Sequence, residues 1–149
     1  MRYMENVVRI TSLPVREEVR ELVTDRRSIE MGRVKITLED GIHVLNIKGL
    51  KDGDVFEFKG KYWRLVQREE KVIRIVLREP TESFRVGFAV GNLHMKAMVL
   101  GNELYIPLEN PNLPNLLSQF KPEVTEKKFI PNVEIPIEGE VVQFVDPDH

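Results

Sequence analysis

The sequence predicts a protein of the α+β class, with a β-rich first half and a second half in which strands and helices alternate. Two observations lead to this prediction. In the first half, short apolar runs are separated by Gly- and Asp-containing turns at intervals of roughly eight to twelve residues, which is typical of a small β-domain. After residue 70, two segments with the apolar period of a helix, about 3.6 residues, interrupt the strand pattern.

Composition favours a soluble protein without disulfides. The 149 residues are enough for one domain or two small ones, and 42% hydrophobic and 31% charged residues suit a globular core under a charged surface. The net charge of −2 predicts no broad attraction to nucleic acid or to an anionic membrane. No apolar run reaches the roughly 20 residues that span a bilayer, and the N-terminus lacks a signal-peptide pattern. The absence of cysteine excludes thiolate metal sites, and we expect a cytoplasmic protein.

Residues 1–70 are expected to form the small β-domain. Glu39-Asp40-Gly41 is suited to a tight hairpin turn, and Asp52-Gly53-Asp54 to a second turn. The segment 15–23 is ambiguous, because its apolar residues fit one face of a helix and also one face of a strand. The expected strands on either side of the turns lie at 34–38, 42–47, 55–58 and 63–66.

The second half opens with an apolar, strand-like run at 72–77, which Pro80 stops. Thr81 can cap a helix through its hydroxyl, and Gly91 can end that helix in a left-handed conformation. Between them, apolar residues recur at i, i+4 spacing, which predicts a helix with buried surface. These residues are Phe84, Val86, Phe88 and Val90.

A hairpin and a second helix follow. Gly101-Asn102 suits a two-residue turn between strands at 95–100 and 104–108. Asn112 can cap the helix, with Pro114 tolerated in its first turn. Its apolar residues have the i, i+3, i+4, i+7 spacing of one buried stripe, and a last strand is expected at 124–129. The stripe consists of Leu113, Leu116, Leu117 and Phe120.

The order of elements over 71–130 is therefore strand, helix, strand, strand, helix, strand. This order is that of a ferredoxin-like βαββαβ domain, which we expect within residues 71–149. An irregular tail should begin at about residue 131, because three prolines and five acidic residues follow from there. A short extended piece at 141–145 is the only regular structure expected in it.

His94 is the most informative candidate for a functional site. The chain has three histidines and no cysteine, so one chain offers too few nitrogen and sulfur ligands for the usual clustered metal site. A symmetric dimer doubles every ligand, however, and can place two copies of one histidine side by side. Without further evidence, a single histidine at this position is more often a structural residue whose side chain forms a hydrogen bond with a backbone carbonyl.

Several motifs resemble the urease accessory protein UreE family. The stretch Phe88 to His94, with Gly91-Asn92-Leu93-His94 after an apolar helix end, is similar to the family's metal-binding segment. Upstream, Asp25-Arg26-Arg27-Ser28 and the segment 32–41 resemble its basic motif and first hairpin. Leu50-Lys51-Asp52-Gly53-Asp54 resembles the Leu-x-Asp-Gly-Asp turn of the family. The resemblance covers roughly residues 20 to 130, and it favours a strand within 15–23.

The resemblance implies a nickel metallochaperone. Such a protein is a homodimer that binds Ni(II) between two copies of His94 and delivers it to the urease apoprotein together with a GTP-hydrolysing accessory protein. Neutral imidazole is a suitable ligand for Ni(II), and Zn(II) or Cu(II) would compete for the same site in vitro. The ferredoxin-like domain would carry the metal and the dimer contact, and the β-domain at 1–70 would bind a partner peptide or protein.

His149, the last residue, is the second candidate ligand, because its imidazole and the terminal carboxylate lie close together. The alternative is that it belongs to a disordered end without a role. Many family members carry a His-x-His pair where this chain has Leu108-Glu109-Asn110, and many end in a histidine-rich tail. These departures put nickel storage in doubt and favour about one ion per dimer.

The remaining candidates are interpreted as structural. We expect His43 to be a strand residue, Asp52-Gly53-Asp54 a turn rather than a calcium loop, and the phenylalanines 84, 88 and 120 core residues, although apolar side chains beside His94 could form the dimer contact. Arg26-Arg27 with Arg33 and Lys35 is either a basic patch for an acidic partner or, as we favour, a solvated strand face.

No motif for catalysis is present, so we do not expect an enzyme. Two other functions are consistent with the sequence. The protein could be an interaction module of the urease assembly machinery in which His94 is structural and no metal is bound. It could also be a small enzyme that uses one metal ion as a Lewis acid, which would require an open coordination position beside a pocket.

Overall fold

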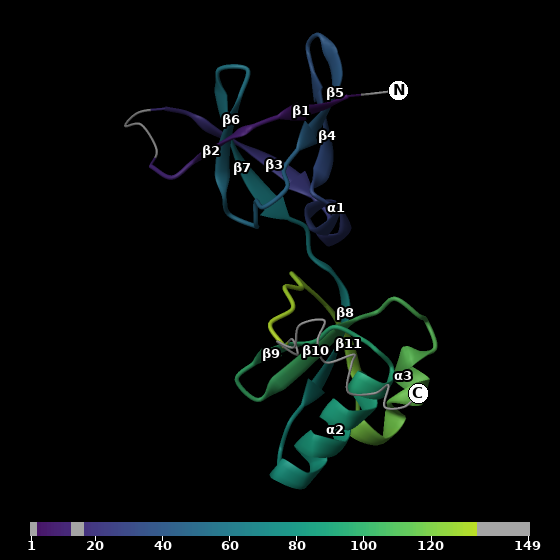
Figure 1. Cartoon of the computed structure of the whole chain (residues 1–149). Helices are drawn as coiled ribbons and strands as arrows, with labels where there is room; N and C mark the ends of the chain where they lie inside the picture. Colours follow the sequence, from purple (N-terminus) through teal and green to yellow (C-terminus); the bar gives the residue numbers. More distant parts are fainter. Residues whose placement is uncertain (1–2, 13–16, 134–149) are drawn as a thin grey trace, which may run out of the picture. The chain divides into compact units, whose positions relative to one another are not determined.

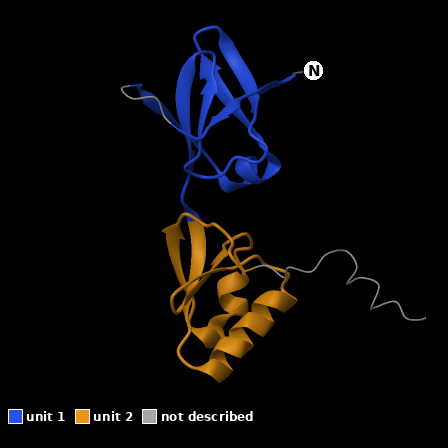
Figure 2. Cartoon of the chain, turned by 60° about the vertical axis from the view of Figure 1, so that its left-hand side comes forward, with its two compact units in different colours: residues 1–70 blue, residues 71–149 orange. Residues whose placement is uncertain are grey.

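The computed structural model describes residues 3–12 and 17–133, and it shows a mixed α+β protein built mostly of strands. The described residues form three sheets and three α-helices, labelled in Figure 1. The chain divides into two compact units, unit 1 at residues 1–70 and unit 2 at residues 71–149, coloured separately in Figure 2.

Unit 1 contains two sheets that share one core. The three-stranded sheet has the order β1-β5-β4, formed by Met4–Asn6, Gly41–Asn46 and Arg33–Leu38. The four-stranded sheet has the order β2-β6-β7-β3, formed by Val8–Ile10, Val55–Phe58, Lys61–Gln67 and Val19–Thr24. The core between them consists mainly of aliphatic and aromatic side chains, including Val34, Ile36, Leu45, Ile47, Phe56, Trp63 and Leu65.

The predicted hairpin around Glu39-Asp40 is confirmed. In β4, Val34 and Ile36 are buried and the residues between them are exposed, which is the alternation of a strand with one face on the core. Leu38 pairs with Gly41, so Glu39 and Asp40 form a two-residue loop. Gly41 has a φ of 124°, which only glycine adopts without strain and which explains its place after the turn.

The ambiguous segment is a strand from Val19 onward, where β3 runs parallel to β7. The helix that follows, α1 at Arg26–Met31, was not expected. The carboxylate of Asp25 accepts a hydrogen bond from the Ser28 amide at 2.7 Å and so caps its first turn. Gly32 ends the helix with a φ of 76°, and a Cβ there would lie 3.0 Å from the Lys48 Cα.

Unit 2 contains the second four-stranded sheet, in the order β11-β8-β10-β9, with helices on one of its faces (Figure 2). The elements along the chain are β8 (Glu70–Val76), α2 (Pro80–Asn92), β9 (Met98–Leu100), β10 (Glu103–Pro107), α3 (Leu113–Leu116), a 3-10 turn (Ser118–Phe120) and β11 (Glu123–Lys127). The core lies between sheet and helices and includes Ile73, Ile75, Val86, Val90, Ile106, Leu117 and Phe120.

Several boundaries in unit 2 differ from expectation. Helix α2 starts at Pro80 with Glu79 as its N-cap, so Thr81 is not the cap; proline is tolerated there because the first turn needs no N–H donor. Helix α3 ends at Leu116, which is 53% exposed, so that residue is not part of the buried stripe. Strand β9 starts at Met98 and not at residue 95, because Ala97 pairs with Val133 instead.

None of the described helices is long and apolar enough to cross a membrane. The predicted tail, including the short extended piece at 141–145, lies outside the described residues from residue 134 onward.

Candidate metal site at the end of helix α2

The C-terminus of helix α2 places His94 by two backbone hydrogen bonds. The His94 N–H donates to the carbonyl of Gly91 at 3.0 Å, and the Met95 N–H donates to the carbonyl of Val90 at 3.3 Å. Together these bonds form a Schellman motif in which Leu93 is the C-cap and His94 follows it. The helix therefore continues through Gly91 and Asn92, and the expectation that Gly91 ends it is wrong.

His94 takes the left-handed conformation that glycine usually supplies at this position. Its φ is 55°, and it is one of three described non-glycine residues with a positive φ. For a side chain with a Cβ this conformation costs about 1 kcal/mol or more relative to right-handed backbone. The histidine is exposed, and its imidazole has no hydrogen bond or ion pair with any residue in 3–12 or 17–133. Among the described residues, therefore, none competes with a ligand for either ring nitrogen.

Phe84 and Phe88 do not belong to the core, contrary to the sequence interpretation. They are 70% and 60% exposed, and their ring centroids lie 5.9 Å apart. The buried residues of α2 are Val86 and Val90. Because residues two apart on a helix lie about 200° apart, the two i, i+4 pairs cannot both face the sheet. The i, i+2 spacing of Phe84 and Val86 in the sequence already indicates opposite faces.

The exposed phenylalanines and His94 belong to one helix and its cap. The row of residues through Phe84 and Phe88 continues at Asn92, two residues before His94. Gly87 and Gly91 on the same helix have open space where a side chain would project. The end of α2 thus presents an aromatic pair, two glycines and an unbonded imidazole.

His43 has a structural environment, as expected. It lies in unit 1 on β5, with its Nδ1 2.6 Å from Glu5 Oε2 and its Nε2 2.7 Å from Asp40 Oδ1. These hydrogen bonds, first to Asp40 and then to Glu5, raise the pKa of His43. The hydrogen bonds from His43 and then from Lys59 lower the pKa of Asp40 to about 2. Both ring nitrogens are occupied, so His43 is a poor candidate for a metal ligand.

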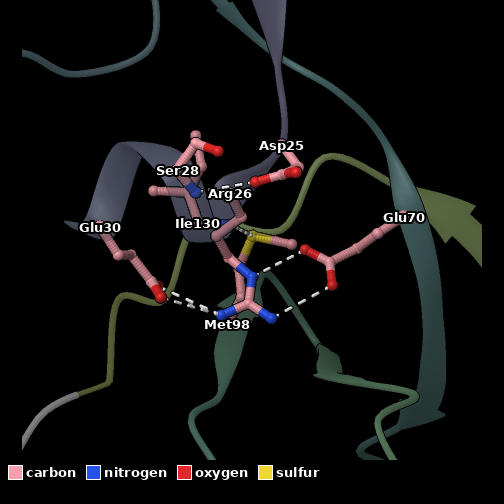
Figure 3. A network of polar contacts seen from close by, with 7 residues as sticks. All are labelled: Asp25, Arg26, Ser28, Glu30, Glu70, Met98 and Ile130. Carbon is pink, nitrogen blue, oxygen red and sulfur yellow. Dashed lines mark hydrogen bonds and ion pairs between the residues drawn. The ribbon is translucent and has the colours of Figure 1, made fainter. Parts of the chain in front are cut away.

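Arg26 does not contribute to an open basic patch. Its Nε and Nη2 donate to Oε1 and Oε2 of Glu70 at 2.7 and 3.2 Å, and its Nη1 lies 3.2 Å from Glu30 (Figure 3). The hydrogen bond to Glu70 is the main cause that raises the pKa of Arg26. Arg33 and Lys35, in contrast, are exposed on β4.

Within residues 3–12 and 17–133, no group of three or more histidine, aspartate and glutamate side chains is placed to hold a metal ion. In the described part, His94 therefore offers a single donor, and His149 lies outside it. A metal at His94 would need donors from a second copy of the chain, from the undescribed tail, or from water.

No protein-family model matches the sequence, and no curated protein matches it.

Proposed function

We propose that this protein is a nickel metallochaperone of the urease accessory protein UreE type. It acts as a homodimer, binds one Ni(II) between two copies of His94, and delivers the ion for assembly of the urease active site. The observation that carries this proposal is the position of His94 at the end of α2. Its backbone is fixed there, and its side chain is exposed and has no hydrogen-bond partner among the described residues. Because the backbone of His94 is already fixed, the residue loses less conformational entropy when its imidazole binds the ion.

The exposed face of α2 supports a two-fold contact beside the metal. Large exposed aromatic side chains on one helix face are typical of protein interaction sites. If Phe84 and Phe88 pack against their counterparts in a second copy, the two α2 helices lie next to each other, and so do their C-terminal ends. A symmetric contact of this kind brings two His94 imidazoles to one ion.

Two imidazoles do not complete the coordination of nickel, which takes four or six donors. The imidazole of His149, which lies outside the described residues, is proposed as a further donor, with water in the remaining positions. Weak, partly aqueous ligation at a surface suits a carrier, because the ion can be released without unfolding a core. Such a site also has the borderline nitrogen and oxygen donors that Zn(II) and Cu(II) would bind in vitro.

The topology of unit 2 is consistent with this proposal. The order of its elements is βαββαβ, and β8 lies between β11 and β10 with β9 at the edge. We propose that this arrangement is the ferredoxin-like metal-binding and dimerisation domain, and that unit 1 binds a partner protein. The partners proposed are the urease apoprotein and the GTP-hydrolysing accessory protein, in the cytoplasm, without a role for nucleic acid, membranes or catalysis.

An interaction module without a metal role is the second candidate function, because the exposed Phe84 and Phe88 would serve it equally well. Nickel titration calorimetry with mass measurement in solution separates the two. We compare the wild type with His94→Asn, since asparagine tolerates the left-handed backbone but lacks the imidazole. His43→Asn is the matched control. The metallochaperone predicts one ion per two chains and loss of most affinity in His94→Asn alone; equal affinity in all three proteins contradicts it.

A further inference from the structure

Unit 1 has a groove between two sheet edges that pair with no other strand in the described chain. Strand β3 is the last strand of one sheet and β4 is the last strand of the other (Figure 1). Residues of both strands and of α1 line a groove of about 480 Å³. Val23 contributes from β3, and Arg33 and Lys35 contribute from β4.

The register of each strand shows which backbone groups face the groove side. The Gly32 carbonyl accepts from the Ile47 N–H at 2.9 Å, so Gly32 faces β5, and the alternate residues Arg33 and Lys35 present their N–H and C=O groups away from it. On β3, the Thr24 carbonyl accepts from the Arg68 N–H at 2.7 Å. Val23 therefore presents its backbone groups to the open side.

The side chains of the groove select for negative charge. Three of the ten lining residues are basic and one is acidic. The acidic residue, Asp25, is engaged at the N-cap of α1 through the Ser28 amide. Arg33 and Lys35 are exposed and form no ion pair in the part of the chain that the structure describes.

The groove also has apolar surface that a peptide side chain could cover. Val23 is 46% exposed and Met31 is 61% exposed, and both line it. An unpaired strand edge next to apolar and charged side chains is the arrangement by which extended peptides add to a sheet. Main-chain hydrogen bonds then supply affinity, and the flanking side chains supply selectivity.

We propose that this groove binds an extended, acidic segment of a partner protein as an added β-strand, with its carboxylates facing Arg33 and Lys35 and its apolar residues covering Val23 and Met31. This inference rests on the partner-binding role proposed above for unit 1. It does not depend on nickel, because neither His94 nor α2 contributes to the groove. Alternating acidic and apolar residues are the pattern that fits, since side chains of a strand alternate between its faces.

The test follows the backbone amide resonances of the full-length protein during titration with a short blocked peptide of alternating glutamate and valine. We expect the largest shifts in β3 and β4, and smaller ones in β1 and β2, which are the edge strands at the opposite ends of the two sheets. Binding should weaken as salt is added, because exposed charges are screened. Largest shifts on β1 and β2, or no binding, would overturn the proposal.

Three controls separate strand addition from simple attraction between charges. A peptide with lysine in place of glutamate should not bind, and the glutamate peptide with alternate N-methyl groups should bind weakly, because it lacks the donors that a strand needs. Lys35→Glu should weaken binding about tenfold, as expected for a charge at the rim of a contact. Lys51→Glu changes an exposed lysine outside the groove and should leave binding unchanged.

Equal binding of the N-methylated and unmodified peptides would show that the groove attracts any polyanion, and it would refute strand addition. Nickel binding measured on the same Lys35→Glu protein distinguishes this proposal from the nickel function. The variant should bind nickel as the wild type does. If the wild type binds no nickel but binds the glutamate peptide, the nickel function fails and the groove proposal stands.

Discussion

Val90 and Met95 are joined by a backbone hydrogen bond of 3.3 Å that spans the C-terminal turn of α2. His94 lies between the C-cap residue and Met95, and this bond requires it to adopt the left-handed conformation, with a φ of 55°. Met95 also packs against the unit 2 core, to which Val90 belongs, so the turn has the hydrophobic contact that commonly accompanies a Schellman motif. The backbone of the proposed ligand is therefore fixed by the core, while its side chain remains in solvent.

The left-handed backbone at His94 predicts that glycine would be the more stable residue there. We expect His94→Gly to raise the free energy of unfolding by roughly 0.5 to 1 kcal/mol, because it removes the Cβ strain, offset in part by the greater entropy of the unfolded chain. Urea denaturation of wild type and variant measures the difference. If the glycine variant were less stable, the imidazole of His94 would have to form contacts that stabilise the fold. That result would contradict the exposed position of this side chain.

The exposed Phe84 and Phe88 predict a change in association without a change in folding. The double variant Phe84→Ser with Phe88→Ser should shift a dimer toward monomers in sedimentation measurements, and its unfolding midpoint, extrapolated to low protein concentration, should remain close to that of the wild type. Val86→Ala is the control on the buried face, where loss of packing should cost about 1 to 3 kcal/mol. A double variant that remains as dimeric as the wild type would place the dimer contact elsewhere.

The Arg26 network predicts unequal effects of its two carboxylates. Glu70 accepts two hydrogen bonds from Arg26, and we expect Glu70→Gln to destabilise unit 1 by about 1 to 2 kcal/mol. Glu30 is a more exposed i, i+4 partner, and Glu30→Gln should cost roughly 0.5 kcal/mol or less. Denaturant unfolding of the two variants gives both values. Equal losses, or a larger loss for Glu30, would contradict this order.

The hydrogen bonds of His43 predict a pH optimum for the stability of unit 1. The pKa of His43 is raised in the folded state, so its contribution is fully present below its ordinary value of 6.5 and is lost as the pH rises through the higher folded pKa. The pKa of Asp40 is lowered from 3.8 to about 2, so its contribution is present above 3.8 and is lost as the pH falls toward 2. The stabilisation should therefore be greatest between about pH 4 and 6.5.

Urea denaturation across this range tests the optimum, with His43→Gln as the variant that cannot become charged. The difference in stability between wild type and variant should decrease above neutral pH. A difference that stays constant from acid to alkaline pH would show that His43 does not form the charged contacts with Glu5 and Asp40. Histidine ring resonances followed over the same range report the direction of the His43 pKa shift independently.

Much of the local structure was determined by the sequence itself. The Glu39-Asp40 loop, the Gly101-Asn102 turn and the helix around Val86 and Val90 all have signals that act over a few residues: a favoured turn, a left-handed glycine, an apolar period. The short helix α1 has such signals as well, since Asp25 and Gly32 cap its two ends, but its six residues are too few to form an apolar period. The sequence indicates His94 as a candidate ligand through a motif resemblance and because the chain has only three histidines.

The tertiary structure decided which way these elements face and where they stop. The two i, i+4 pairs of α2 are equally apolar, and packing against the sheet buried Val86 and Val90 and left Phe84 and Phe88 in solvent. Strand β9 is shorter at its start than expected. Met95 belongs to the turn that ends helix α2, and Ala97 pairs with Val133, more than thirty residues away in the sequence. His94 directly precedes the strand expected at 95–100, and in the structure it follows the C-cap of helix α2. Its conformation depends on hydrogen bonds that only the completed core around Val90 and Met95 fixes, because a local preference of about 1 kcal/mol is easily overridden by packing.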